Sequence, residues 1–181
     1  MKRHIITTAC LIISVFLFGC IKKTPDINCV PPLSKFNTIN LLTFDTESVI
    51  DEFGAGPSTL KGITNAIMDE LEKKLFEDKN FSRIYRGSNE CTVGTLIVEG
   101  KLVQMKYKVK GIHSKITDDL SITRAKGKYE ILANTRVVNC KTGETLFLFE
   151  TNDSDSDLYD LSKNLGGDIA DYINKKARKC D

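Results

Sequence analysis

The chain has 181 residues, with 26 lysine and arginine residues against 24 aspartate and glutamate residues, and its formal net charge is +2. Removal of residues 1–19 would take away Lys2 and Arg3 but no acidic residue, so the charges of the remaining chain balance. A nucleic-acid-binding protein needs a basic surface, and this balance argues against a nucleic-acid partner.

The amino-terminal segment has the pattern of a secretory signal. A basic start precedes an apolar run over residues 5–18, which is shorter than the roughly 20 residues needed to span a bilayer. The sequence Leu17-Phe18-Gly19-Cys20 then places a small residue directly before a cysteine. This pattern resembles the lipobox of bacterial lipoproteins, in which diacylglycerol is attached to the cysteine thiol before cleavage. We therefore expect residues 1–19 to be a signal peptide and Cys20 to be lipidated.

The lipoprotein resemblance also implies a location. In that class the residue after the cysteine directs sorting, and Ile21 is not the aspartate that retains lipoproteins in the inner membrane. The expected place is therefore the outer membrane, with the protein facing the periplasm. Residues 20–34 are mostly polar, contain three prolines and show no periodicity, so we interpret them as a tether. The alternatives are an uncleaved anchor helix, or a plain signal peptide followed by a chance cysteine.

Apolar patterning predicts four strands, over residues 36–44, 94–109, 128–138 and 145–149. In the second strand the alternation changes phase at Leu102-Val103, which predicts a β-bulge. The fourth strand is almost wholly apolar and is therefore expected to be central or covered. Between the third and fourth strands, residues 140–143 predict a tight turn in which Gly143 takes a positive φ.

Two amphipathic helices are expected. The first is capped by Ser58 or Thr59 and ends near residues 79–80. The second runs from 158 to 176 with Asp157 as its N-cap, and Gly166-Gly167 predicts a kink or a close approach to the sheet. The apolar positions that define the buried stripes are Leu60, Ile63, Ile67, Leu71 and Leu75 in the first helix, and Leu161, Leu165, Ile169 and Ile173 in the second.

The order strand–helix–strand–strand–strand–helix predicts a single α+β domain over residues 35–181. Its expected form is a mostly antiparallel four-stranded sheet with both helices packed on one face. The segments 94–101, 135–138 and 142–146 resemble an uncharacterised family of bacterial lipoproteins, a domain of unknown function. That domain is related in fold to the TolB amino-terminal domain and to the curli-secretion lipoprotein. The likeness covers residues 36–176, but residues 108–126 replace the glycine-rich basic segment that such proteins often carry.

Four cysteines remain besides the lipidation site, and an even number in an exported chain favours disulfides. If the strands at 94–109 and 128–138 are antiparallel neighbours with Val98 opposite Ala133, the same register places Cys91 opposite Cys140, within disulfide reach. Cys29 and Cys180 are then left for one another. The alternative is that these two stay free or pair between molecules. The four are Cys29, Cys91, Cys140 and Cys180.

No pattern of residues predicts a catalytic site. His113 is the only histidine after residue 19, and the cysteines have disulfide partners available, so neither a Cys–His nor a Ser–His pair is supported. The acidic segment 153–157 alternates like the start of an EF-hand. However, Leu158 stands where the turn glycine is required and Asn164 where the bidentate glutamate is required. We therefore expect no enzyme activity, no cofactor and no metal site.

These observations together predict a membrane-anchored, periplasm-facing binding or scaffolding module. It would contact another envelope protein, or itself, through an exposed sheet edge or through the face opposite the helices. The curli-secretion resemblance implies one alternative, a subunit of an outer-membrane secretion or transport complex that contributes strands or an accessory domain. The alternating stretch 103–109 is shorter than the about 9–11 residues of a membrane-spanning strand, which disfavours strand donation. An uncharacterised enzyme is the second alternative.

Overall fold

The computed structural model describes residues 33–88, 90–110 and 126–177. Cys20, Cys29, His113 and Cys180 lie outside these residues, so the expectations placed on them stay predictions. The elements are β1 (Thr38–Leu41), β2 (Ile50–Asp51), α2 (Pro57–Glu77), β3 (Arg83–Arg86), β4 (Thr95–Lys110), β5 (Lys126–Asn139), β6 (Thr145–Asp155) and α3 (Leu158–Ala177). None of the helices in the described part is long and apolar enough to cross a membrane.

The sheet has six strands and is mixed, which corrects the expectation of four mostly antiparallel strands. Its order is β3-β1-β4-β5-β6, with β2 pairing a further stretch of β4. The β4–β5 and β5–β6 pairs are antiparallel. By contrast, β1 is parallel to both β3 and β4, and β2 is parallel to β4. A parallel pair needs a crossover connection, and α2 provides it between β1 and β3.

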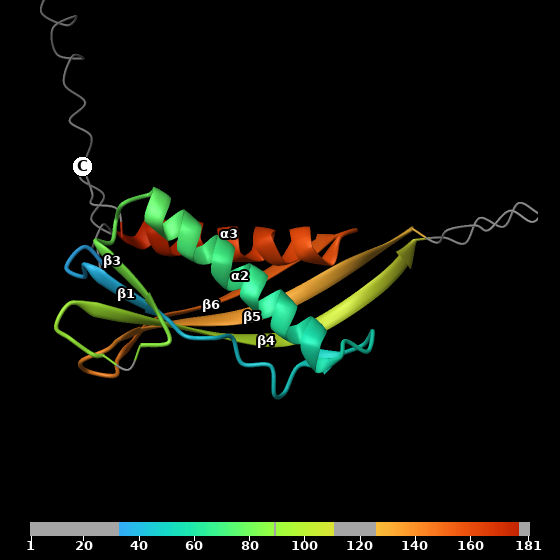
Figure 1. Cartoon of the computed structure of the whole chain (residues 1–181), viewed down its shortest axis with the longest axis horizontal. Coiled ribbons are helices and arrows are strands. Elements are labelled where there is room, and N and C mark those ends of the chain that lie inside the picture. Colours follow the sequence, from blue (N-terminus) through green and yellow to red (C-terminus); the bar gives the residue numbers. More distant parts are fainter. Residues whose placement is uncertain (1–32, 89, 111–125, 178–181) are drawn as a thin grey trace, which may run out of the picture. The chain divides into compact units, whose positions relative to one another are not determined.

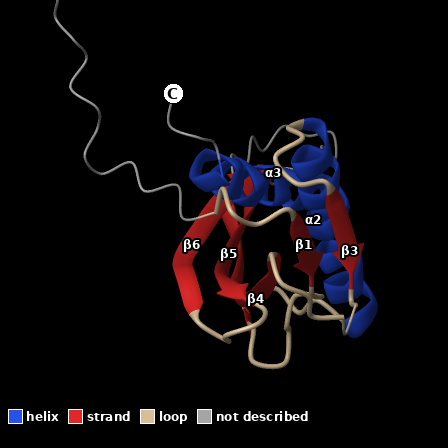
Figure 2. Ribbon diagram, turned by 90° about the vertical axis from the view of Figure 1, so that its left-hand side faces the viewer, coloured by secondary structure: helices blue, strands red, loops and turns tan. Residues whose placement is uncertain are grey.

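Both helices cover the same face of the sheet, as expected (Figure 1, Figure 2). The predicted stripes pack into the core, except that Leu60 is only partly buried. Gly166 is buried in α3 because that helix lies against α2 at this point. An added Cβ there would collide with the backbone carbonyl oxygen of Ile67. The close approach predicted from Gly166-Gly167 therefore exists, but it is to α2 and not to the sheet.

The two helix starts differ in how well local sequence describes them. Asp157 caps α3 as predicted, since its Oδ1 accepts hydrogen bonds from the backbone N–H of Tyr159 (2.8 Å) and of Asp160 (3.0 Å). The predicted cap of α2 is wrong. Its N-cap is instead Gly56, before Ser58 and Thr59, and Pro57 takes the first helical position, where a missing N–H costs nothing.

The β-bulge in β4 is confirmed at the predicted place. The register with β5 shifts between Leu102 and Gln104, so Val103 is the extra residue. Leu102 and Met105, three apart in sequence, can therefore both point into the core, and both are fully buried. The turn after β5 is also confirmed, with Gly143 at φ 70°.

The core also includes a residue that the sequence assigned to the tether. Leu33 is 1% exposed and belongs to the central apolar cluster. A turn closed by the hydrogen bond from the Phe36 N–H to the Leu33 carbonyl (3.0 Å) directs both side chains inward. The folded part of the chain therefore begins no later than Leu33.

Candidate interaction surface

The sheet ends in two edge strands of very different character. On one side, β3 has four residues, and on the other, β6 has eleven. An edge strand exposes unpaired backbone N–H and C=O groups, and natural proteins protect such edges with short strands, with charged side chains, lysine especially, or with proline. The comparison between the two edges therefore indicates where another chain can add to this sheet.

The β3 edge is protected. It is short, and it begins with Arg83 and ends with Arg86. Arg86 is also held by α2, through ion pairs with Asp69 (2.8 Å) and Glu72 (2.6 Å). A strand that docked here would have to displace or desolvate these charged groups, so β3 is a poor acceptor.

The β6 edge, by which we mean the outward side of residues 145–155, is unprotected along its first half, residues 145–149. The strand reads TLFLFETNDSD and contains no lysine, arginine or proline. Its first half is apolar, and Leu148 is 71% exposed. No other strand of the described part pairs with its outward side. The apolar segment 145–149, expected to be central or covered, instead lies at the edge of the sheet (Figure 2).

An aromatic cluster flanks this edge on the helix side of the sheet. Phe149 stacks on Tyr172 of α3 with ring centroids 4.0 Å apart, and Phe147 meets the same ring edge-on at 6.4 Å. The Lys176 Nζ lies 5.5 Å from the centre of the Phe147 ring. All three rings are only partly buried. Aromatic residues with a polar rim are typical of interface centres.

The opposite face of the sheet is polar over most of its area. Its strands carry ion pairs between Lys108 and Glu130 (2.7 Å) and between Arg136 and Glu99. Exposed ion pairs of this kind contribute little to stability. Their presence indicates that this face of the sheet is in contact with solvent. The exception is next to β6, where Leu148 lines a depression of about 430 Å³. Leu148 is therefore an exposed apolar side chain on a largely polar face.

The acidic residues near β6 do not form a metal site among the residues that the structure describes. The Asp155 carboxylate accepts the Asp157 N–H (3.1 Å), which lowers the pKa of Asp155, and Asp157 is occupied by its capping role. The first part of the acidic segment 153–157 is strand and not loop, because β6 continues to Asp155. Burial, and then the carboxylates of Asp153 and Asp171, raise the pKa of Asp168.

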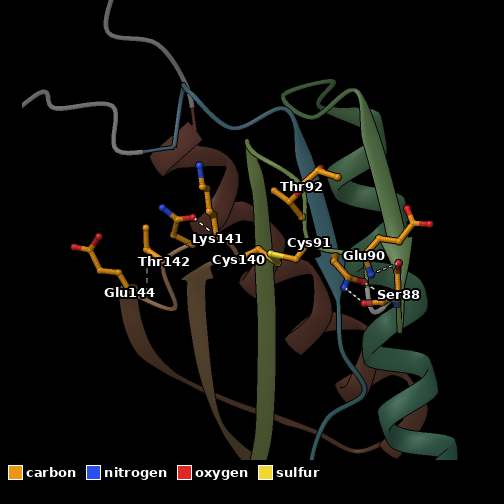
Figure 3. The surroundings of a disulfide bond; sticks show 11 residues. Ser88, Glu90, Cys91, Thr92, Cys140, Lys141, Thr142 and Glu144 are labelled. Atoms are coloured by element: carbon orange, nitrogen blue, oxygen red, sulfur yellow. Dashed lines mark hydrogen bonds between the residues drawn. A yellow bond between two sulfur atoms is a disulfide. The ribbon is translucent and has the colours of Figure 1, made fainter.

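The structure contains the Cys91–Cys140 disulfide, with the Cα atoms 5.6 Å apart (Figure 3). The strand register behind that pairing is nevertheless wrong by four residues. Val98 lies opposite Val137, and the Cys140 N–H donates to the Thr95 carbonyl (3.1 Å).

Cys91 reaches Cys140 by a turn that the register argument did not contain. The Thr95 N–H donates to the Thr92 carbonyl (3.2 Å), and Gly94 takes φ 82°. On the other side of Cys91, the Asn40 side chain of β1 accepts the N–H of Ser88 (3.2 Å). These contacts hold the segment before β4 beside the turn after β5, and the disulfide joins the two.

Comparisons with known proteins bear on the fold. No protein-family model and no curated protein matches the sequence. Among solved structures, the chain is similar to PelC from Paraburkholderia phytofirmans, described as a dodecamer, with a TM-score of 0.51 and 10% identity over 82% of this chain and 94% of that one.

Two further structures resemble the chain less closely. The hypothetical protein CT253 from Chlamydia trachomatis has a TM-score of 0.47 and 7% identity, over 78% of this chain and 98% of that one. A minor lipoprotein from Acinetobacter baumannii has a TM-score of 0.38 and 9% identity, over 78% and 91%. At such identities the similarity concerns the fold alone.

Proposed function

We propose that this protein is a lipoprotein of the cell envelope whose folded domain acts as a non-catalytic binding or scaffolding module. Lipid on Cys20 would hold it to the outer membrane, with Ile21 as the sorting residue, and the domain would face the periplasm. Leu17-Phe18-Gly19-Cys20 supports the anchor. A disulfide in the folded domain is in keeping with export, since disulfides persist in oxidising compartments.

The observation that carries the binding role is the β6 edge. A long strand without lysine, arginine or proline, whose first half is apolar and is flanked by partly exposed aromatic rings, is a surface on which a further strand gains backbone hydrogen bonds and apolar contacts. The fold similarity to PelC, which is described as a dodecamer, supports self-association as one form of that role.

The anchor is tested by blocking lipoprotein processing. Globomycin should cause an unprocessed precursor to accumulate, and Cys20→Ala should release the protein from the membrane fraction. Normal processing with globomycin, together with membrane retention of the Cys20→Ala chain, would contradict the proposal.

The binding role is tested on membranes that contain the tagged full chain. Proteins that copurify with it should be lost on Leu148→Lys but retained on Val93→Lys. Val93 is a matched control because it is 76% exposed, against 71% for Leu148, and lies outside β6. Equal recovery from both variants would argue against the β6 edge as the contact surface.

A further inference from the structure

We propose that the β6 edge pairs with the β6 edge of a second copy of this chain. The two strands would run antiparallel about a two-fold axis at Leu148 and join the two sheets into one. This inference rests on the proposed function and names its partner and surface.

The first argument is the mismatch between the composition of β6 and its place in the sheet. Residues 145–149 have the nearly continuous apolar sequence of a strand that is covered on both faces. The structure nonetheless places them at an edge, with Leu148 71% exposed. A strand added to this edge would give them the surroundings that their composition suits.

The second argument is the direction of the backbone groups. The Asn139 N–H of β5 donates to Glu144, on the β6 side, and the Cys140 N–H donates to Thr95, on the β4 side. Because these directions alternate along a strand, Val137 and Thr135 bond toward β6, and they lie opposite Phe147 and Phe149.

It follows that the residue after each of the two phenylalanines points its backbone groups the other way. Leu148 and Glu150 direct their N–H and C=O groups to the free edge. In an antiparallel pair centred on Leu148, the two copies of that residue would therefore exchange both of their backbone hydrogen bonds.

The third argument is that the edge is self-complementary in this register. A register shifted toward the carboxyl end of β6 would bring the acidic half of the strand into the paired segment, and the edge would no longer be self-complementary. About an axis at Leu148, Phe147 faces Phe149 of the second copy on the helix side, next to Tyr172. On the opposite face the two Leu148 side chains meet. The carboxylates of Asp153 and Asp155 then lie beyond the paired segment, so like charges do not face each other.

A head-to-tail pairing of β6 with β3 of the next copy is disfavoured because β3 is a protected edge. The Arg86 side chain of β3 forms ion pairs with Asp69 and Glu72 of α2. A two-fold pair, in which the same patch serves both copies, uses only the unprotected edge, and such closed pairs are the commonest form of soluble oligomer.

Thiol cross-linking of the full chain in membranes tests the axis. In a hydrogen-bonded antiparallel pair, opposite Cα atoms are about 5.5 Å apart, so Leu148→Cys should yield a cross-linked product of twice the chain mass with a short thiol-specific reagent. Glu150→Cys is the matched control, since it lies on the same exposed edge. Its two copies would be separated by four residues along the strands, about 14 Å, beyond the reach of that reagent. The unsubstituted chain reports any background from the native cysteines.

A second measurement uses two differently tagged full-length copies expressed together. The recovery of one copy with the other should fall at least about tenfold on Leu148→Lys. Each copy would lose a leucine that the pair buries, and two lysines of like charge would face each other. Val93→Lys should leave the recovery unchanged.

The outcomes separate this inference from the function on which it rests. A doubled-mass product from Leu148→Cys, absent from Glu150→Cys, supports the two-fold pair. The absence of a product, equal products from both variants, or a product of another mass would overturn it, and the last would indicate a different occupant of the edge. If one of these contrary results is found while the protein is still retained in the membrane through Cys20, the proposed lipoprotein function is not contradicted.

Discussion

The crossing of the two helices yields a sharp prediction, because two adjacent glycines in α3 should respond differently to alanine. An alanine at Gly167 meets no atom within 4 Å and should stabilise the helix by about 1 kcal/mol through propensity alone. An alanine at Gly166 gains the same propensity term, but its Cβ collides with the Ile67 backbone of α2. Backbone cannot rotate out of the way, so the cost is that of overpacking, about 1–3 kcal/mol.

The propensity term cancels when the two variants are compared with each other. Gly166→Ala should therefore unfold about 1–3 kcal/mol more easily than Gly167→Ala, and its melting temperature should be lower by about 2–4 °C for each kcal/mol. Denaturant titration and thermal unfolding followed by circular dichroism measure the difference, with the unsubstituted protein as reference. Equal stability of the two variants, or a more stable Gly166→Ala, would refute the close contact between α2 and α3.

Four further outcomes follow from the described residues. Replacing both Cys91 and Cys140 by serine should lower the unfolding free energy by about 4 kcal/mol in the chain-entropy model, since the bond spans 49 residues; an unchanged denaturation midpoint would contradict this. Leu33→Ala should cost about 2–5 kcal/mol as a core truncation, and an unchanged denaturation midpoint would contradict the burial of Leu33. The pKa of Asp168 is raised above its ordinary 3.8, so the folded chain loses stability as pH rises through that pKa; Asp168→Asn should give a small gain at pH 7 that vanishes below about pH 3.8, and a constant gain at both pH values would be inconsistent. Calcium at millimolar concentration should leave the melting temperature unchanged, and a rise with calcium but not with magnesium would overturn the reading of the acidic segment.

Features set by neighbouring residues could be read from the sequence. The phase change at Leu102-Val103 locates the bulge, Asp157 locates the start of α3, and Gly143 locates the turn after β5. The helix cap and the turn depend on contacts within a few residues of the chain, and the bulge is visible as a local change in the apolar alternation, so the local pattern contains the information. The predicted start of α2 is wrong because Pro57 at the first helical position outweighs a cap by the adjacent Ser58 or Thr59.

Features set by long-range pairing could not be read in the same way. β2 has two residues and β3 has four, too few for any alternation to be visible, and they become strands only because β4 and β1 lie beside them. The β4–β5 register differs by four residues from the one that apolar matching suggests, because several registers bring apolar residues together and only the bulge and the intervening turns select one.

The segment 145–149 shows the same division at the candidate surface. Its apolar sequence by itself determined that these residues need a covered strand, since side-chain chemistry fixes how much surface must leave water. Only the tertiary structure decided that this strand lies at the edge of the sheet, because strand order depends on which distant segments pair, and β1 and β3 add to β4 on the other side. The lipobox predicted at Cys20 is the opposite case. A short contiguous motif carries that prediction, and no tertiary contact is needed to recognise it.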